Sequence, residues 1–355
     1  MPEIWRAGGS NTRFDPAEIA ALEAQGWDGQ MFMDSQSLSA DPWALMGAWA
    51  RESTRLKLSP GVTNPLTRNL AVTAASAATI QMLSGGRAVL GVGRGDSALA
   101  YLGMAPVPVA RFEQDLVTLQ TLLSGGAVAF EATGERGDGP ASHSLSLGAR
   151  PEATQLKWLA TSGLPKVPLD VAATGPRVIA MGARLAERVT FSVGAGLDRV
   201  QWALDLARSA RAGMAGTGPS YGVQVVVVCH PDDATAMDVA MRMAAPLARF
   251  QVMQGSAKGP SKGHQNASLQ AIRDGYDMNR HGGVHEQNRL THGALSPEFV
   301  RDFAVVGTPE ACTAKLLALR DAGIDRFVIV GPGFYPPEWG EAADLFAREV
   351  LPALR

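Results

Sequence analysis

The sequence has little of several features that would define a class of protein. Its 355 residues include only Cys229 and Cys312, which are too few for a disulfide framework and too far apart for a zinc site. No stretch approaches the roughly 20 apolar residues of a membrane helix. The first residues, MPEIWRAGG, lack the apolar core of a signal peptide. We therefore expect a cytoplasmic protein with no membrane partner.

An excess of one charge is also missing. The formal net charge is −2 and no run of Lys and Arg is visible, so nucleic acid is not an expected partner. A content of 46% hydrophobic and 19% charged residues is typical of a chain that forms a packed core. This length allows two domains, but it also allows one large α/β barrel.

The clearest pattern present runs from Leu56 to Gly95. A short β-prone run is broken at residues 61–65, and an alanine-rich segment over 69–83 favours a helix packed on a sheet. The run 88–92 then has the continuous apolar character of a parallel strand buried on both faces. Because ligands bind beyond the carboxyl ends of such strands, the loops that follow are candidate binding loops.

Strand-like and helical segments alternate along the rest of the chain. The strands are predicted at residues 3–7, 29–33, 56–60, 88–92, 169–173, 188–192, 222–229 and 326–330. Residues 303–306 are interpreted as a connector. Eight strands in this order predict an α/β fold, a (β/α)₈ TIM barrel in which residues 1–355 form one domain. Two insertions, at about 125–165 and 254–296, interrupt it, and the first is expected to carry a small hairpin.

Three separated motifs resemble the bacterial-luciferase-like superfamily of flavin- and deazaflavin-dependent oxidoreductases. They read GVTNPLTRNLAVTAASAATIQMLSGGRAVLGVGRGDS, AATGPRVIAMGARLAERV and FAVVGTPEACTAKLLALRDAGIDRFVIV. Within it, the chain is most similar to the deazaflavin-using branch that contains methylenetetrahydromethanopterin reductase. The resemblance implies a barrel whose mouth holds coenzyme F-420, an 8-hydroxy-5-deazaflavin, or FMN. We also expect a homodimer and a small-molecule substrate.

The resemblance also implies where the cofactor lies. A non-proline cis peptide between Gly61 and Val62 would back the ring, and the cofactor's phosphate would lie near the ends of the fourth and fifth strands, where backbone N–H groups at a helix start suit an anion. The residues placed at the cofactor in this way are Gly61, Val62, Thr63, Asn64, Gly93, Arg94, Gly95, Asp96, Ser97, Ala173, Thr174, Gly175, Pro176, Arg177 and Gly194.

The catalytic residues are predicted at the end of the second strand. Several relatives carry an Asp-His pair there, whereas this chain has Asp34 and Ser35. Asp34 could equally cap a helix or pair with Arg6. If hydride leaves a deazaflavin, the protein mainly holds two partners in line and needs no nucleophile. The prediction is hydride transfer between coenzyme F-420 and a small organic substrate. The alternatives are an FMN-dependent monooxygenase with a partner reductase, and a non-catalytic flavin-binding relative.

Other features have weaker interpretations. Gly93-Arg94-Gly95 alone could be a plain turn. His281 and His285 have a spacing that a metal site could use, but they lie in a glycine-rich segment without acidic partners, so we expect no metal and interpret the segment as a lid or interface loop. Trp43 and Trp158 are expected near the mouth, and both insertions are expected to select the substrate.

Overall fold

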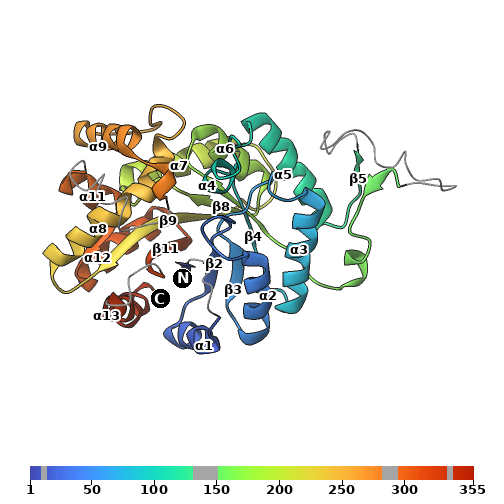
Figure 1. Ribbon diagram of the computed structural model, residues 1–355, viewed down its shortest axis with the longest axis horizontal. Coiled ribbons are helices and arrows are strands. Elements are labelled where there is room, and N and C mark those ends of the chain that lie inside the picture. The colour runs from blue at the N-terminus through green and yellow to red at the C-terminus, as the bar shows by residue number, and fades with distance from the viewer. Residues whose placement is uncertain (9–13, 131–150, 282–294, 334–338) are drawn as a thin grey trace.

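The structure is a computed structural model that describes residues 1–8, 14–130, 151–281, 295–333 and 339–355. Strands gather at the centre and helices surround them (Figure 1). All eight predicted strands are confirmed, and they are β1 (Glu3–Gly8), β2 (Gly29–Phe32), β3 (Lys57–Pro60), β4 (Leu90–Val92), β7 (Leu169–Ala173), β8 (Arg188–Phe191), β9 (Ser220–Cys229) and β11 (Arg326–Gly333).

The strands close into a parallel barrel. Hydrogen-bonded neighbours follow the order β3-β2-β1-β11-β9-β8-β7-β4, and every paired neighbour along this path is parallel. The two ends of the path meet through isolated parallel bridges from Leu58 to Ala88 and from Thr63 to Val92. The carboxyl ends of all eight strands therefore point to one mouth, as the (β/α)₈ prediction requires.

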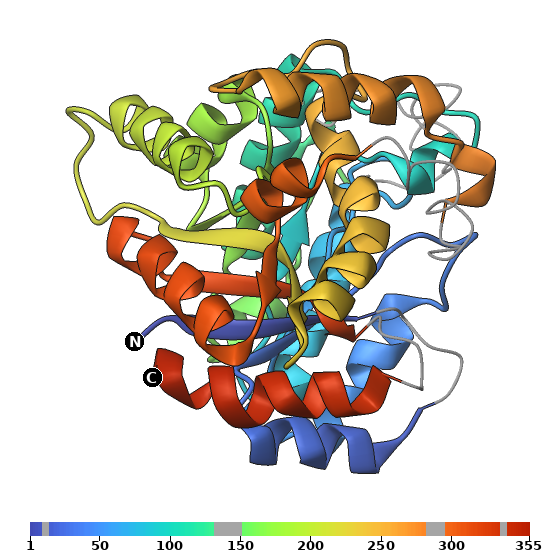
Figure 2. The same ribbon diagram turned by 90° about the vertical axis from the view of Figure 1, so that its left-hand side faces the viewer.

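Helices cover the outside of the barrel. They are α1 (Pro16–Gln25), α2 (Pro42–Glu52), α3 (Leu70–Leu83), α5 (Val109–Leu123), α6 (Pro176–Leu185), α7 (Leu197–Ala210), α8 (Asp233–Ala248), α12 (Pro309–Ala322) and α13 (Gly340–Leu345), which continues through η7 (Phe346–Val350) and η8 (Pro352–Leu354). Asp15 and Asp41 cap α1 and α2 with proline next in sequence, as predicted. The C-terminal helices lie beside α1 (Figure 2), where Trp27 stacks on Phe346 with ring centroids 5.6 Å apart.

Several short elements were not predicted. The segment expected to be a connector contains β10 (Val305–Gly307), which pairs with Val227–Cys229 at the end of β9. Ser97–Ala100 form the short helix α4. The helix after β9 turns into η4 (Arg249–Gln251), the second insertion holds α9 (Gly263–Gly275) and η5 (Met278–Arg280), and α11 (Pro297–Phe303) follows it. Few apolar side chains of α9 are buried, which is why its polar sequence gave no helical signal.

The first insertion does contain antiparallel strands, β5 (Val128–Ala129) and β6 (Ala153–Thr154), followed by η3 (Leu159–Thr161). Residues 131–150, the middle of this insertion, lie outside the described residues. The expectation that Trp158 lies near the mouth is wrong, because of where this insertion leaves and rejoins the barrel. It leaves from the end of α5 and returns at the start of β7, so it lies at the amino-terminal end of the barrel, and the 40%-exposed Trp158 lies there with it.

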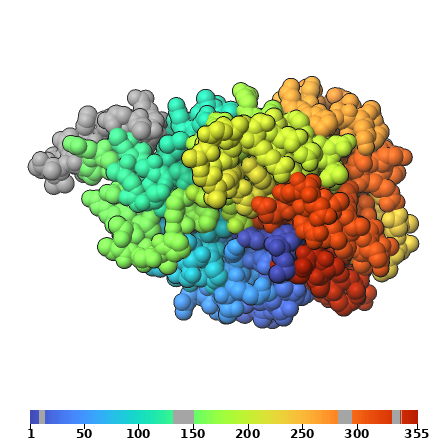
Figure 3. Space-filling view, turned by 180° about the vertical axis from the view of Figure 1, so that it is seen from behind, coloured from blue at the N-terminus to red at the C-terminus, as the bar shows by residue number. Residues whose placement is uncertain are grey.

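That amino-terminal end is filled by a charged network. Arg326 is fully buried and donates hydrogen bonds to Asp170 at 3.0 Å, Thr190 at 2.9 Å and Ser220 at 2.7 Å. Glu3 accepts from Arg188 and Lys57 at 2.5 Å and from the Trp5 indole at 2.8 Å. Figure 3, which views the molecule from behind Figure 1, shows the N-terminal residues in blue on this side.

No helix in the described ranges is long and apolar enough to cross a membrane.

Candidate active site at the mouth of the barrel

The predicted site residues lie at the carboxyl ends of five strands: β2, β3, β4, β7 and β8. The loops after β3 and β4 are in direct contact, because the Thr63 N–H donates to the Gly91 carbonyl at 3.0 Å and the Gly93 N–H donates to the Thr63 carbonyl at 2.9 Å. A Cβ on Gly93 would lie 2.9 Å from a methyl of Val62. Glycine at this position is therefore what lets the two loops approach so closely.

The peptide between Gly61 and Val62 is cis, which confirms that prediction. The Gly61 N–H donates to the Phe32 carbonyl at 2.6 Å, which joins this loop to the end of β2. Asn64 has a local structural role: it is 2% exposed, and its side-chain oxygen accepts from the backbone N–H groups of Leu66 and Thr67, both at 3.0 Å. Its oxygen is thereby used to shape the loop.

The segments that follow β2 and β3, including the start of α2, hold five side chains that we call the polar cluster. Each has a buried polar atom without a hydrogen-bond partner in the described structure; these atoms are Asp34 Oδ2, Ser35 Oγ, Trp43 Nε1, Thr63 Oγ1 and Thr67 Oγ1. Ser35 is 1% exposed and Thr63 is fully buried. Sequence analysis singled out Trp43 only by its position near a loop, and Thr67 had no distinguishing signal. The strands β2 and β3 are neighbours in the barrel, and Thr63 acts on the pKa of Asp34, so these two side chains lie close together.

Burial raises the pKa of Asp34 above its ordinary value, and the charge of Asp41 adds to the rise. Thr63 and the charge of Arg68 oppose it, although the Thr63 hydroxyl makes no hydrogen bond of ordinary geometry. Arg68 is paired with Asp41 and lies over the Trp43 ring at 5.9 Å. The proposed pairing of Asp34 with Arg6 is wrong, because Arg6 pairs with Glu18 at 2.9 Å.

Two arginines mark the predicted phosphate end. Burial lowers the pKa of Arg94, and the nearby charge of Arg177 in the first turn of α6 lowers it further, so two cations from different segments lie near each other. Arg94 donates to the Val107 carbonyl at 2.5 Å and to Gln254 at 2.8 Å. Gly175 caps α6 without a side-chain hydrogen bond, and a Cβ there would meet nothing within 4 Å. Together these groups suit an anion such as a phosphate.

The other two predicted glycines are tightly packed. Gly95 has a φ of +84°, and a Cβ there would lie 2.4 Å from Leu99 in α4. Gly194 has a φ of +80°, and a Cβ there would lie 2.5 Å from the Phe303 ring. These contacts account for both glycines without a cofactor, so their place in the binding site stays a prediction. Gly175 is the position where a side chain tests cofactor binding cleanly.

The second insertion docks on the loop after β4 through a buried group that sequence analysis missed. Arg249 is 4% exposed, pairs with Asp96 at 2.6 Å and lies 3.2 Å from the His281 ring. The Tyr276 hydroxyl lies 2.5 Å from the other nitrogen of His281, whose pKa burial and Arg249 lower to about 4. The only sequence signal was an arginine inside an apolar run. His285 lies outside the described residues, and in the described ranges no three His, Cys, Asp or Glu side chains could hold a metal.

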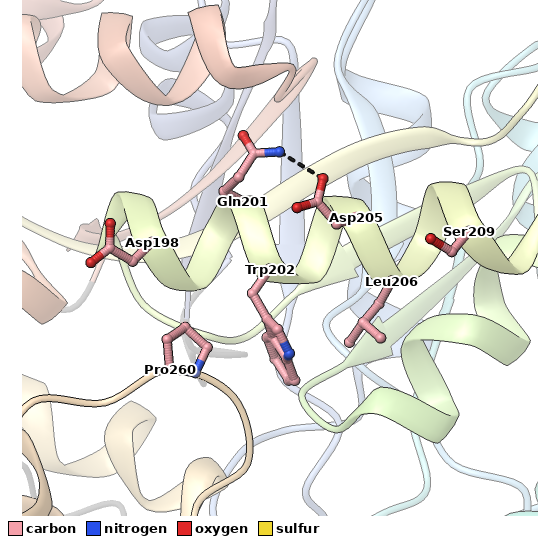
Figure 4. A pocket seen from close by; sticks show the side chains of 7 residues that line it. All are labelled: Asp198, Gln201, Trp202, Asp205, Leu206, Ser209 and Pro260. Carbon is pink, nitrogen blue, oxygen red and sulfur yellow. Dashed lines mark hydrogen bonds between the residues drawn. The ribbon is translucent and has the colours of Figure 1, made fainter.

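A cavity of about 520 Å³ lies elsewhere, along the outer side of α7 (Figure 4). Trp202, Leu206 and Pro260 form its apolar part, and Asp205, which also lines it, accepts a hydrogen bond from Gln201 at 2.8 Å. None of the predicted site residues lines it. The strand ends, and not this cavity, therefore define the candidate active site.

Comparison with known proteins agrees with this architecture. Residues 8–326 match the model of the luciferase-like monooxygenase family, and the chain belongs to this family. A curated relative, 5,10-methylenetetrahydromethanopterin reductase from Archaeoglobus fulgidus, is 24% identical over 346 residues, which cover 95% of this chain and 94% of the relative.

Two solved structures share the fold. The coenzyme F-420 dependent tetrahydromethanopterin reductase of Methanopyrus kandleri matches with a TM-score of 0.71 and 20% identity, covering 100% of this chain and 99% of that one. A coenzyme F-420 dependent secondary alcohol dehydrogenase, solved with a cofactor–acetone adduct, matches with a TM-score of 0.69 and 18% identity over 100% and 99% of the two chains. The luciferase-like TIM barrel predicted from the sequence is thereby confirmed.

Proposed function

We propose that this protein is an oxidoreductase that transfers a hydride between coenzyme F-420 and a small organic substrate at the mouth of the barrel. The observation that carries the proposal is the arrangement of the loops after β3, β4 and β7. Gly93 allows the first two to touch, and the charge of Arg177, at the start of α6, acts on Arg94 in the loop after β4. These features suit a planar cofactor with a phosphate-bearing side chain.

Both coenzyme F-420 and FMN carry such a phosphate, so the choice between them is supported by the relatives. The reductase from Archaeoglobus fulgidus matches almost end to end, and both solved structures above are named as dependent on coenzyme F-420. When bound, the deazaflavin would supply or accept the hydride. The residues of this chain would hold the ring at Val62 and Thr63, hold the phosphate near Arg94 and Arg177, and present the substrate on the side of Asp34 and Ser35.

The test is a titration of cofactor-free protein with coenzyme F-420 and, separately, with FMN. We expect coenzyme F-420 to bind more tightly than FMN. We also expect the bound reduced cofactor to be oxidised when a substrate accepts its hydride in the absence of oxygen. Tighter binding of FMN, with reduced flavin consumed only when oxygen is present, would overturn the proposal in favour of a monooxygenase.

A further inference from the structure

The two cysteines of the chain are neighbours in the structure, although they are far apart in the sequence. Cys229 ends β9, Cys312 lies near the start of α12, and both are fully buried. A buried residue touches about 6–12 others, so a second cysteine placed at random in a chain of 355 residues would seldom be one of them. The pair therefore requires an explanation beyond packing.

The pairing of β10 with β9 brings the Cys312 sulfur to Cys229. Gly307 of β10 lies opposite Cys229 in the register of the two strands. The Cys312 Sγ lies 3.5 Å from the Gly307 carbonyl oxygen and 3.8 Å from the carbonyl oxygen of Val228, the residue before Cys229. The Cys312 sulfur is thus held against the backbone beside Cys229.

The two thiols also act on each other. A hydrogen bond with Cys312 lowers the pKa of Cys229, whereas the same interaction, together with burial, raises the pKa of Cys312. Cys229 is therefore the first of the pair to lose its proton. The thiolate is the form of cysteine that attacks an oxidant, whereas an isolated buried thiol is inert.

A metal ion does not account for the pair. Structural zinc sites use four protein ligands. Among the residues that the structure describes, no group of three His, Cys, Asp or Glu side chains could hold a metal. The chemistry that needs only two adjacent thiols is their oxidation to a disulfide.

We propose that Cys229 and Cys312 are a redox pair that hydrogen peroxide converts into a disulfide, and that this bond braces the base of the second insertion. The Cys229 thiolate attacks one oxygen of the peroxide, which leaves a sulfenic acid on Cys229 and releases hydroxide. The Cys312 thiol then attacks that sulfur, forms the S–S bond and releases water. The hydroxide takes up the proton that Cys229 lost, so two thiols lose two electrons and one peroxide becomes two waters.

The disulfide would close residues 229–312 into a covalent loop. This loop contains α8, the second insertion, α11 and β10. A crosslink across so long a segment restricts the unfolded chain, so the oxidised protein should be the more stable form. Neither cysteine is among the residues predicted to bind the cofactor, and the inference does not depend on which cofactor the protein uses.

The first experiment counts free thiols in the wild-type protein. The protein is treated with hydrogen peroxide or with diamide, freed of the reagent, unfolded in guanidinium and titrated with Ellman's reagent. Because the chain has no other cysteine, the count should fall from two to none, and dithiothreitol should restore both. Peptide mapping without reduction should show the peptides of Cys229 and Cys312 joined within one chain.

Three results of this experiment would overturn the proposal. Two free thiols after both treatments would show that the pair does not react. A sulfinic or sulfonic acid on either cysteine would show that the second thiol does not capture the first. A disulfide between two chains would show that the thiols do not meet within one molecule.

The second experiment measures the brace. Wild-type protein oxidised with diamide should melt roughly 5 °C above the same protein in dithiothreitol. Cys312→Ala retains Cys229 but cannot form the bond, so its melting temperature should be the same after either treatment. Any stability that the substitution itself costs cancels, because each protein is compared with itself. Cys229→Ala is an equivalent control, and the thiol count needs neither variant.

Two outcomes would contradict the brace. An equal rise in Cys312→Ala would show that oxidation elsewhere causes the change in melting temperature. A wild-type protein that contains the disulfide but melts no higher than the reduced form would show that the bond does not stabilise the base of the insertion.

Discussion

Two carboxyl groups, one at each end of the barrel, have pKa values that are shifted in opposite directions. At the amino-terminal end, burial alone would raise the pKa of Glu3, but hydrogen bonds and charge from Arg188 and Lys57 lower it to about 2. At the mouth, burial raises the pKa of Asp34 and no partner reverses the rise. The difference shows which carboxylate stabilises the fold and which is available to a ligand.

The largest effect on the free energy of unfolding is expected from breaking the network around Asp170 and Arg326 at the amino-terminal end of the barrel. Asp170 is 2% exposed and accepts hydrogen bonds from Thr190 at 2.9 Å and Arg326 at 3.0 Å. Asp170→Ala would leave the Arg326 charge buried and unpaired, which costs about 3–5 kcal/mol of unfolding free energy. Chemical denaturation measures it.

The matched control is Asp233→Ala, which breaks an ion pair of 2.6 Å to Arg301 whose side chains are half exposed. That change should cost less than about 1 kcal/mol. If the two variants lose the same stability, the amino-terminal network is not what holds this end of the barrel together.

The next prediction is that Glu3→Gln and Asp34→Asn change the melting temperature at pH 7 in opposite directions. The pKa of Glu3 in the folded protein, about 2, lies below the ordinary 4.5. Its stabilisation is therefore present above about pH 4.5 and is lost as the pH falls toward 2; a shift of this size corresponds to about 3 kcal/mol. Glu3→Gln should lower the melting temperature at pH 7 and weaken this acid dependence.

Asp34→Asn should do the reverse. Because folding raises the pKa of Asp34, its ionised form destabilises the folded protein at neutral pH, and this cost falls as the pH is lowered through the folded-state pKa. Removing the charge should raise the melting temperature at pH 7. A loss of stability in Asp34→Asn would mean that Asp34 has structural partners and would break the comparison.

A smaller effect is expected at the phosphate end. A Cβ on Gly175 meets nothing within 4 Å in the protein, so Gly175→Val should leave folding unchanged and block only a ligand that approaches the start of α6. We expect binding of coenzyme F-420 to weaken by about 10-fold or more, equivalent to about 1.4 kcal/mol.

Gly263→Val is the control for that variant. Gly263 also lies at a helix start, that of α9, and a Cβ there also meets nothing within 4 Å. Its affinity for the cofactor should equal that of the wild type. Wild-type affinity in Gly175→Val as well would place the phosphate at another loop.

Much of the fold could be predicted because its signals are local. Apolar runs such as 222–229 predict buried strands, and Asp-Pro pairs predict helix starts. The pairing of Arg249 with Asp96 could not be predicted, since 153 residues separate them and only folding brings them together. Much of the polar cluster was predicted: Asp34, Ser35 and Thr63 were named as site residues and Trp43 as a residue near the mouth. Thr67 and the lack of partners could not be predicted, because they depend on how the segments after β2 and β3 pack.

The smallest expected effect is a change in the pKa of Asp34 when the charge of Asp41 is removed. Asp41 does two things: one carboxylate oxygen pairs with Arg68, and the other caps α2 by accepting from the Ala44 N–H at 3.0 Å. Asp41→Asn retains the cap, because asparagine is as good an N-cap as aspartate, but it removes the negative charge. The charge of Arg68 is then no longer offset, and the pKa of Asp34 falls.

The protonated carboxyl band that Asp34 contributes to the infrared spectrum should therefore disappear at a lower pH in Asp41→Asn than in the wild type. Spectra of the cofactor-free proteins across a pH series, with Asp34→Asn to identify the band, give the two profiles. The control is Asp15→Asn, which changes a similar proline-followed cap on α1, where the Ala17 N–H donates to Asp15 at 3.0 Å, but does not act on Asp34. Its pH profile should match the wild type. Identical profiles for all three proteins would mean that the charge of Asp41 does not act on Asp34.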